Sequence, residues 1–510
     1  MNSTSNTRRV ASNSFWYGIE MAIGLATVLA TTIPLARVIG PDRLGYFSYV
    51  GWLTNVSAAI GSLGITLAMR KYMAESLGNE DGSRARAVYR TTLRLQSLLA
   101  LALTATGLVL VFTVARTDSR WVSAFLVLSM LPAMVGSVPS QANMAGERMK
   151  VNTIGSLVAN TINIASVTSS LLLGWDLLGV AIGMFLYRTV DCLYRSLSVL
   201  RWLGRYAIVP LDSETKERMK RFSGYSLIQT LLHLVVWDRS EMIFLRYFSS
   251  SDAQITFYAL AFNMTEKLQL VPNALSSGIG ARLFAQYGTD RDRVPQLTAT
   301  SMRYILLCAV PFMLGLAALS PVLIPLVYGD PYRPAVTVVV ISATFAIARG
   351  LMHPVRTLMQ ATENQARLTV WLISCALLNL VLDVILIPAH GAVGAAVANG
   401  VSQAVMVWGI WFQAKRLFQI NVRWLDLVKI ALAGGIMTAI VHGLQRLVEG
   451  WWFVTAAVMM GTVTYVATLR LTQAFDKDDR WRLEQLQARL PKKAGPVFRQ
   501  LLRFLIPVGV

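Results

Sequence analysis

Charged residues are scarce in this sequence. Only 15% of its 510 residues are charged, whereas 55% are apolar, and soluble domains carry about 25% charged residues. This shortage excludes a soluble globular enzyme and a disordered chain. The apolar residues form continuous runs rather than alternating with polar ones, which excludes an outer-membrane β-barrel. The composition therefore predicts an all-α integral membrane protein.

Cysteines are also few, and common catalytic motifs are absent from the sequence. Cys192, Cys308 and Cys375 lie inside apolar stretches, so buried thiols are expected rather than disulfides. The sequence contains no phosphate-binding glycine loop, paired-cysteine metal site or zinc-protease histidine pair. We therefore expect no cofactor, no metal and no ATP-driven pumping by this chain alone. The first apolar run, 15–39, is too long for a cleaved signal and predicts a first span.

The apolar runs predict about fourteen transmembrane helices. A spanning helix needs about 20 mostly apolar residues, and its backbone groups must be paired within the helix. The sixth, seventh and tenth spans carry charges and give the weakest hydropathy signals. The predicted spans are 14–38, 46–69, 93–115, 121–143, 154–174, 177–200, 224–248, 254–281, 302–327, 334–360, 368–388, 391–414, 426–447 and 451–472.

Basic residues are distributed unevenly between the two sides of these spans. Lys and Arg number 47 against 27 acidic residues. With the N-terminus inside, 35 of them, including Arg195 and Arg303, fall on the cytoplasmic side, seven on the opposite side and five inside spans. Because Lys and Arg concentrate on the cytoplasmic side, this split predicts that both termini are cytoplasmic. It also indicates that the positive charge sets the orientation of the chain in the membrane and faces anionic lipid, rather than binding nucleic acid.

The two halves of the sequence resemble each other. The offset between matching positions is 209–216 residues and covers six spans, so the repeats are parallel, as in two-lobed alternating-access transporters with a midplane site in the cleft. The matching residues are Pro139, Glu147, Asn163 and Gly179 in the first half, and Pro354, Glu363, Asn379 and Gly394 in the second. The predicted domains are an N-terminal lobe (1–222, spans 1–6), a C-terminal lobe (223–422, spans 7–12), spans 13 and 14 (423–472), and a basic cytoplasmic tail (473–510), either an interfacial helix or solvated.

A few cationic and polar residues interrupt the predicted spans. Ionisable residues are costly in lipid and are functional candidates by default. Four cationic or polar residues recur at helical spacing along span 10, where Pro354 could kink the helix: Arg349, His353, Arg356 and Gln360. Arginine suits phosphate because its fork makes bidentate contacts. We therefore predict a cationic cleft for an anionic substrate group, lined by Arg188, Arg239, Lys267, Arg349, His353, Arg356 and Gln360.

Carboxylates in the spans are candidates for ion or proton coupling. The competing interpretation is that the charges pair with one another as structural bridges, for example Arg188 with Asp191 and Glu266 with Lys267. The coupling candidates are Glu20, Asp191, Asp238, Glu241 and Asp383.

Short motifs follow one another in a fixed order. They are Ala36–Phe47 (ARVIGPDRLGYF), Leu63–Tyr72, Phe257–Ala261, Val327–Tyr332, Leu378–Pro388 and Gly391–Ala396. With these motifs, fourteen predicted spans and a duplication, the chain resembles the polysaccharide-transport branch of the multidrug/oligosaccharidyl-lipid/polysaccharide exporter superfamily, the O-antigen and exopolysaccharide flippases. The resemblance covers nearly the whole chain.

This resemblance implies a transporter rather than an enzyme. Such a flippase would move an undecaprenyl-diphosphate-linked oligosaccharide from the inner to the outer leaflet of the bacterial inner membrane, as its two lobes rock about a cationic cleft. An ion gradient or the membrane potential would drive the movement. The implied partners are the lipid-linked substrate, membrane lipids, and the polymerase and glycosyltransferases of the same pathway.

Three other functions remain open. A peptidoglycan lipid II flippase of the same superfamily would share the fold and a related diphosphate carrier. A cation-coupled multidrug exporter usually has twelve spans and a carboxylate-lined cavity. A membrane polysaccharide polymerase or glycosyltransferase normally needs a large extracytoplasmic loop, and none of the predicted outside connections exceeds about ten residues.

Overall fold

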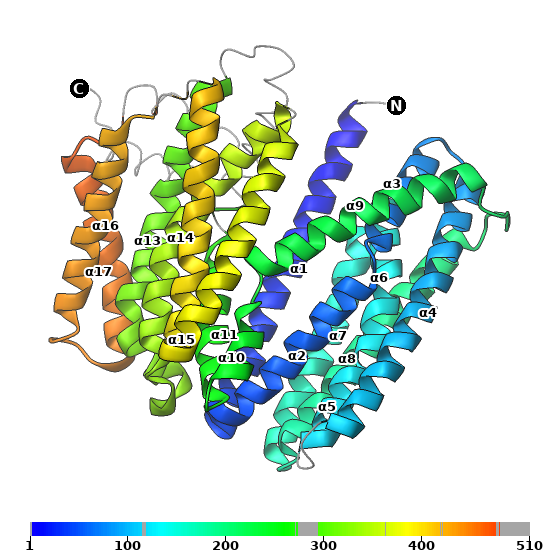
Figure 1. The fold of residues 1–510 in the computed structure, drawn as a ribbon, viewed down its shortest axis with the longest axis horizontal. Coiled ribbons are helices and arrows are strands. Elements are labelled where there is room, and N and C mark those ends of the chain that lie inside the picture. Colours follow the sequence, from blue (N-terminus) through cyan, green and yellow to red (C-terminus); the bar gives the residue numbers. More distant parts are fainter. Residues whose placement is uncertain are drawn as a thin grey trace. The chain divides into compact units, whose positions relative to one another are not determined.

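The described part of the chain is helical. The computed structural model describes residues 3–114, 119–270, 272–273, 294–362, 364–418, 420, 422–475 and 479. Within these ranges there is no strand, so the all-α prediction is confirmed (Figure 1). The chain divides into two compact units. Unit 1 comprises Met1–Arg246 and Ser250–Thr256, and unit 2 comprises Tyr247–Ser249 and Phe257–Val510.

Unit 1 contains ten helices and the first turn of the eleventh among its described residues. Their bounds are α1 (Ser3–Ile39), α2 (Pro41–Gly61), α3 (Ile65–Gly78), α4 (Gly82–Val114), α5 (Arg120–Leu128), α6 (Met130–Ala145), α7 (Met149–Leu172), α8 (Asp176–Leu203), α9 (Ser213–Trp237), α10 (Glu241–Phe248) and α11 (Ala253–Leu268). α11 continues into unit 2.

Unit 2 contains longer helices. Their bounds are α13 (Val294–Tyr328), the short 3-10 helix η3 (Asp330–Tyr332), α14 (Ala335–Ala361), α15 (Gln365–Phe418), α16 (Trp424–Leu444) and α17 (Gly450–Leu471). α15 is two helices joined at Gly391, whose φ of 54° and ψ of −129° are not helical. Its two halves match predicted spans 11 and 12.

Many of these helices can cross a membrane. In the described ranges, nine are long and apolar enough, or ten if the bent pair α2–α3 counts as one span. The chain is therefore a multi-pass membrane protein. The count of fourteen and the cytoplasmic termini remain predictions. The second part of predicted span 8, residues 271 and 274–281, lies outside the described residues.

Two predicted spans differ from the structure because they are broken. Span 2 bends by 49° between α2 and α3, at Gly64, which adopts the left-handed φ of 68°. Span 7 is interrupted at Asp238, an extended residue whose carboxylate accepts a hydrogen bond from the Arg239 backbone N–H at 2.8 Å. A side chain that binds the local backbone in this way competes with helical hydrogen bonding.

α9 packs against α2 and α3 at this bend (Figure 1). A Cβ on Gly64 would lie 2.7 Å from the Ser223 carbonyl oxygen, so only glycine lets the two backbones approach so closely. α9 begins at an N-cap, where Asp212 accepts a hydrogen bond from the Thr215 backbone N–H at 2.7 Å. Arg84 also donates to the Thr215 hydroxyl at 2.6 Å. The first turn of α9 is therefore bonded to the first turn of α4.

A second set of hydrogen bonds joins the start of α2 to the start of α11 and the residues before it. The Asp42 carboxylate accepts hydrogen bonds from the Ser251 hydroxyl and from the Ala253 backbone N–H. The Thr256 hydroxyl donates to the Pro41 carbonyl at 2.7 Å. A Cβ on Gly45 would collide with the Asp252 carbonyl. Pro41, Asp42 and Gly45 of the first motif thus have a packing role.

The duplicated glycines occupy comparable positions. Gly179 follows the turn between α7 and α8, and a Cβ there would collide with Ser170 on the preceding helix. Gly394 follows the joint of α15, and a Cβ there would collide with the Leu386 carbonyl. Both residues allow two consecutive helices to approach closely.

Candidate functional site

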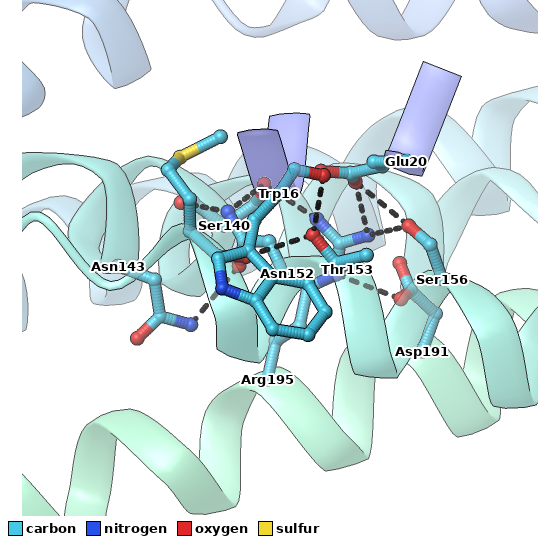
Figure 2. Close-up of polar contacts among 10 residues, drawn as sticks. Trp16, Glu20, Ser140, Asn143, Asn152, Thr153, Ser156, Asp191 and Arg195 are labelled. Carbon is cyan, nitrogen blue, oxygen red and sulfur yellow. Dashed lines mark hydrogen bonds and ion pairs between the residues drawn. The ribbon is translucent and has the colours of Figure 1, made fainter. Parts of the chain in front are cut away.

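A buried arginine connects four helices of unit 1 (Figure 2). Arg195 on α8 donates to Asp191 at 2.7 Å, to the Ser140 hydroxyl on α6 at 2.6 Å and to the Ser156 hydroxyl on α7 at 2.9 Å. Its guanidinium also lies 3.4 Å from Glu20 on α1. Ser156 in turn donates to Glu20 at 2.7 Å. Two of the predicted coupling carboxylates are therefore brought together by one cation.

Further polar contacts fasten α1 and α6 to α7. The Thr153 hydroxyl donates to the Trp16 backbone carbonyl at 2.9 Å. The Asn143 side-chain amide donates to Asn152 at 3.1 Å, and the Trp202 indole donates to Asn143 at 3.3 Å. Because polar groups inside a membrane bundle hold helices together, this network fixes the packing around Arg195.

Arg195 corrects one step of the charge count. The charge count placed it on the cytoplasmic side, although predicted span 6 (177–200) includes it, and in the structure it lies within α8 and is only 8% exposed. The cost of burying its charge is offset by Glu20 and Asp191. Its signal in the sequence was the i, i+4 spacing from Asp191, which permits an ion pair on one helix face.

Arg188, two turns earlier on α8, has a different environment. Its guanidinium donates to Asn55 at 3.0 Å, to Ser129 at 3.3 Å and to the Tyr187 hydroxyl at 3.3 Å. All three acceptors are neutral. Among the described residues no carboxylate lies within ion-pair distance of it, so the predicted pairing with Asp191 is not made. The positive charge of Arg188 remains available to an anion.

Three candidates lie at the break between α9 and α10. The Arg239 guanidinium lies 3.7 Å from the Asp238 carboxylate, which makes this pair locally neutral. Glu241 begins α10 and is fully buried. These residues therefore mark a helix break inside predicted span 7.

Unit 2 holds the remaining cationic candidates. Arg349 on α14 is half-buried, and its guanidinium lies 5.8 Å from the centre of the Phe262 ring on α11. Lys267 on α11 is half-buried and Arg356 on α14 is exposed. Neither has a carboxylate within ion-pair distance among the described residues. The side chains of His353 and Gln360 lie outside the described residues.

Asp383 lies in a buried polar region of α15. Its side chain is 0% exposed, as is that of Asn379, whose amide donates to it at 3.0 Å. On the second half of α15, Asn399 and Gln403 are also buried, and Gln403 donates to Asn399 at 2.7 Å. The two halves run back along each other, since Trp371 at the start of the helix bonds Gln413 near its end. This register puts both polar pairs at matching heights.

A second buried arginine lies at one end of unit 2. Arg303 on α13 is 8% exposed, and its guanidinium lies 3.3 Å from Asp426 and 2.7 Å from Asp479. The Tyr304 hydroxyl donates to Asp479 at 2.5 Å. The charge count had placed Arg303 on the cytoplasmic side, at the start of predicted span 9 (302–327). Because α13 begins at Val294, Arg303 lies inside the helix, where two carboxylates compensate it. Residues 476–478 and 480–510 of the predicted tail lie outside the described residues.

The cations described above differ in whether carboxylates compensate their charge. Arg195 and Arg303 are each compensated by two carboxylates and hold helices together. Arg188, Lys267 and Arg356 have no carboxylate partner within the described ranges. All three cysteines are free, as expected.

Comparisons with known proteins show the family of the chain. A family model described as "Polysaccharide biosynthesis protein" matches residues 34–337. A succinoglycan biosynthesis transport protein of Rhizobium meliloti is 22% identical over 70% of this chain and 69% of its own length. A probable low-salt glycan biosynthesis flippase of Haloferax volcanii is 26% identical over 30% of this chain and 33% of its own length.

Solved structures show the same fold. The lipid II flippase MurJ in an inward closed conformation has a TM-score of 0.72 and 14% identity, and the match covers 90% of this chain and 98% of that one. An inward-facing multidrug resistance MATE family transporter of the MOP superfamily has a TM-score of 0.65 and 14% identity, over 77% and 94% of the two chains. At this identity the likeness concerns the fold alone.

Proposed function

Because this chain belongs to the polysaccharide biosynthesis protein family and is a flippase-type transporter with the MOP superfamily fold, we propose that it flips an undecaprenyl-diphosphate-linked glycan. The glycan moves from the inner to the outer leaflet of a bacterial inner membrane by alternating access. The glycan then serves the polymerase and glycosyltransferases of its own pathway.

The observation that carries this proposal is the environment of Arg188. A guanidinium inside a membrane span is costly unless an anion or water compensates it. Here its neighbours are the neutral oxygens of Asn55, Ser129 and Tyr187. A diphosphate group offers the paired oxygens that a guanidinium binds best. Arg188 is therefore the group in unit 1 that gains most from an anionic substrate.

Three cations of unit 2 extend the same role. Arg349, Arg356 and Lys267 lie on α14 and α11, which are adjacent because Gln269, the residue directly after α11, donates to the Ala346 carbonyl on α14. Arg356 and Lys267 have no carboxylate partner in the described part of the chain. Their positive charge supports contact with the diphosphate, with His353 and Gln360 as further candidates on the same helix.

Energy coupling is assigned to Asp383. Its carboxyl group is fully buried, next to Asn379 and at the height of Asn399 and Gln403. Such a group can bind a proton or a small cation with the help of neighbouring amide oxygens. Glu20 and Asp191 are instead held by Arg195, and Asp238 lies beside Arg239, so structural roles have the better support there. Glu241 remains a coupling candidate through its full burial.

The relatives favour one pathway over the alternatives. Similarity to a succinoglycan biosynthesis transport protein favours an exopolysaccharide over O-antigen. Lipid II, the substrate named for a flippase of the same fold, is the second candidate. A multidrug exporter would need a carboxylate-lined cavity. The uncompensated charges found in the described part of the spans include three cations, Arg188, Lys267 and Arg356, which favour an anionic substrate instead. Neither the family nor these relatives support a polymerase or glycosyltransferase.

The test uses a deletion host complemented with variants. Arg188→Gln alone, and Arg349→Ala with Arg356→Ala, should abolish surface glycan and make the lipid-linked precursor accumulate, with protein levels unchanged. The control is Arg333→Ala, because this exposed arginine pairs with Asp330 at 2.8 Å outside the spans and should export normally. Normal surface glycan in both test variants would contradict the proposal.

A further inference from the structure

Aromatic side chains gather where α15 ends and α16 begins. Trp408, Trp411 and Trp424 have ring centroids 5.3–6.4 Å apart, and the rings of Trp408 and Trp424 are nearly parallel, at 6°. Trp411 is buried, whereas Trp408 is 56% exposed and Trp424 is 46% exposed. The cluster therefore has a buried base and two indoles open to the surroundings.

Two cations lie over aromatic rings of the same helix. The Lys415 ammonium is 5.3 Å from the centre of the Trp411 ring, and the Arg416 guanidinium is 4.2 Å from the centre of the Phe412 ring. Both are exposed, and no carboxylate of the described residues lies within ion-pair distance of either. We name Trp408, Trp411, Phe412, Lys415, Arg416 and Trp424 the aromatic–basic patch.

The backbone beneath the patch is fixed. The Trp371 indole donates to Gln413 at 2.8 Å, and its ring fills the space over Gly409. This contact fastens the first half of α15 to the second half directly under the patch. Asp426, the acidic residue nearest in sequence, is buried and held by Arg303, so it does not neutralise the patch.

We propose that the aromatic–basic patch binds the headgroup of an anionic phospholipid of the surrounding bilayer. Indole rings favour the membrane–water interface, and Lys and Arg near the membrane surface attract anionic lipid. A guanidinium stacked on a ring keeps its N–H edge free for phosphate oxygens. The exposed indoles would then lie along the lipid chains. A zwitterionic headgroup carries no net charge and gains less.

The experiment measures lipid binding to the full chain. Delipidated protein in detergent is titrated with phosphatidylglycerol or phosphatidylcholine, and the bound lipids are counted by native mass spectrometry. Each basic residue contributes about fivefold, so Lys415→Gln with Arg416→Gln should lower the preference for phosphatidylglycerol by about 25-fold. The matched control is Arg201→Gln with Arg205→Gln, which removes two exposed charges from α8 and the residues after it and should keep the preference.

A second measurement tests the indoles. Brominated phosphatidylglycerol should quench the fluorescence of the wild-type chain more than that of a variant with Trp408→Phe and Trp424→Phe. Equal loss of preference in the test and control variants would overturn the proposal, because general charge would then explain binding. Displacement of the phospholipid by excess inorganic phosphate, or by a tighter-binding polyprenyl diphosphate, would also overturn it.

Discussion

Replacing Arg195 with methionine should destabilise unit 1. Methionine has a similar length but none of the donors that reach Asp191, Ser140, Ser156 and Glu20. Breaking a buried ion pair by removing one partner costs about 3–5 kcal/mol. The carboxylate side chains retain 22% and 26% exposure, which lets water reach them in part. We therefore expect a loss near the lower end, about 3 kcal/mol.

Removing the whole charge cluster should reverse most of this loss. In the triple variant Glu20→Gln, Asp191→Asn and Arg195→Met, no charge remains buried without a partner. Replacing a complete buried ion cluster by well-packed hydrophobic residues is often neutral or stabilising by about 1–4 kcal/mol, and the neutral amides of this variant likewise leave no buried charge unpaired. Unfolding of both variants and the wild type is followed by thermal denaturation in lipid nanodiscs, and surface glycan is measured in the complemented deletion host.

Two results would refute this reasoning. If Arg195→Met is as stable as the wild type, the network does not stabilise the packing of α1, α6, α7 and α8. If the triple variant is as unstable as the single one, charge balance is not the cause. Export by the triple variant then separates the two roles of the carboxylates. Normal export indicates that Glu20 and Asp191 are structural, whereas a stable but inactive protein indicates coupling.

Two further predictions concern the fastenings of unit 1. Gly45→Ala should reduce protein stability and export because its Cβ would collide with a backbone carbonyl. The control is Gly51→Ala in the same helix, whose Cβ meets no atom within 4 Å and which should be tolerated. The stabilities of the two variants are compared by thermal denaturation. Hydrogen bonds from Thr215 hold the pKa of Asp212 below its ordinary value, so its stabilisation is present above the unfolded pKa and is lost as pH falls through the folded pKa. Asp212→Ala should therefore cost about 1 kcal/mol at neutral pH, and this difference from the wild type should shrink below about pH 4. Asp212→Asn keeps a capping acceptor and should retain most of the stability.

The sequence predicts the helices better than their breaks. Long apolar runs must be helical in a membrane, and this rule locates both ends of α17 and the C-terminal end of α13 within one residue. The polar first turns of α13 begin eight residues before the predicted span. It does not locate the bend at Gly64, because glycine is frequent inside membrane helices and only the approach of α9 makes this one decisive. The break at Asp238 was also missed, since a charge in a hydropathy window lowers the signal without indicating a local backbone bond.

The sequence predicts which residue types make up the candidate site, but not which of these residues contact one another. Hydropathy identifies ionisable residues within spans, and Glu20 and Asp191 were found in this way. Their common partner, Arg195, was counted with the cytoplasmic charges although predicted span 6 includes it, because a charge near the end of an apolar run is indistinguishable from one beyond it. Ser140 and Ser156 carried no signal, since a single serine in an apolar run is ordinary. Which charges meet depends on helix packing, which one sequence does not contain.

Charge compensation separates the arginines that hold the fold from those able to bind substrate. Two unit charges 4 Å apart attract by about 4 kcal/mol at an effective dielectric constant of 20. Arg195 and Arg303 already have two carboxylates each, so an approaching phosphate would meet an environment with net negative charge and be repelled. Arg188 has only neutral acceptors, so the full attraction is available there. A diphosphate entering unit 1 should therefore be bound at Arg188 and not at Arg195, although both lie on α8.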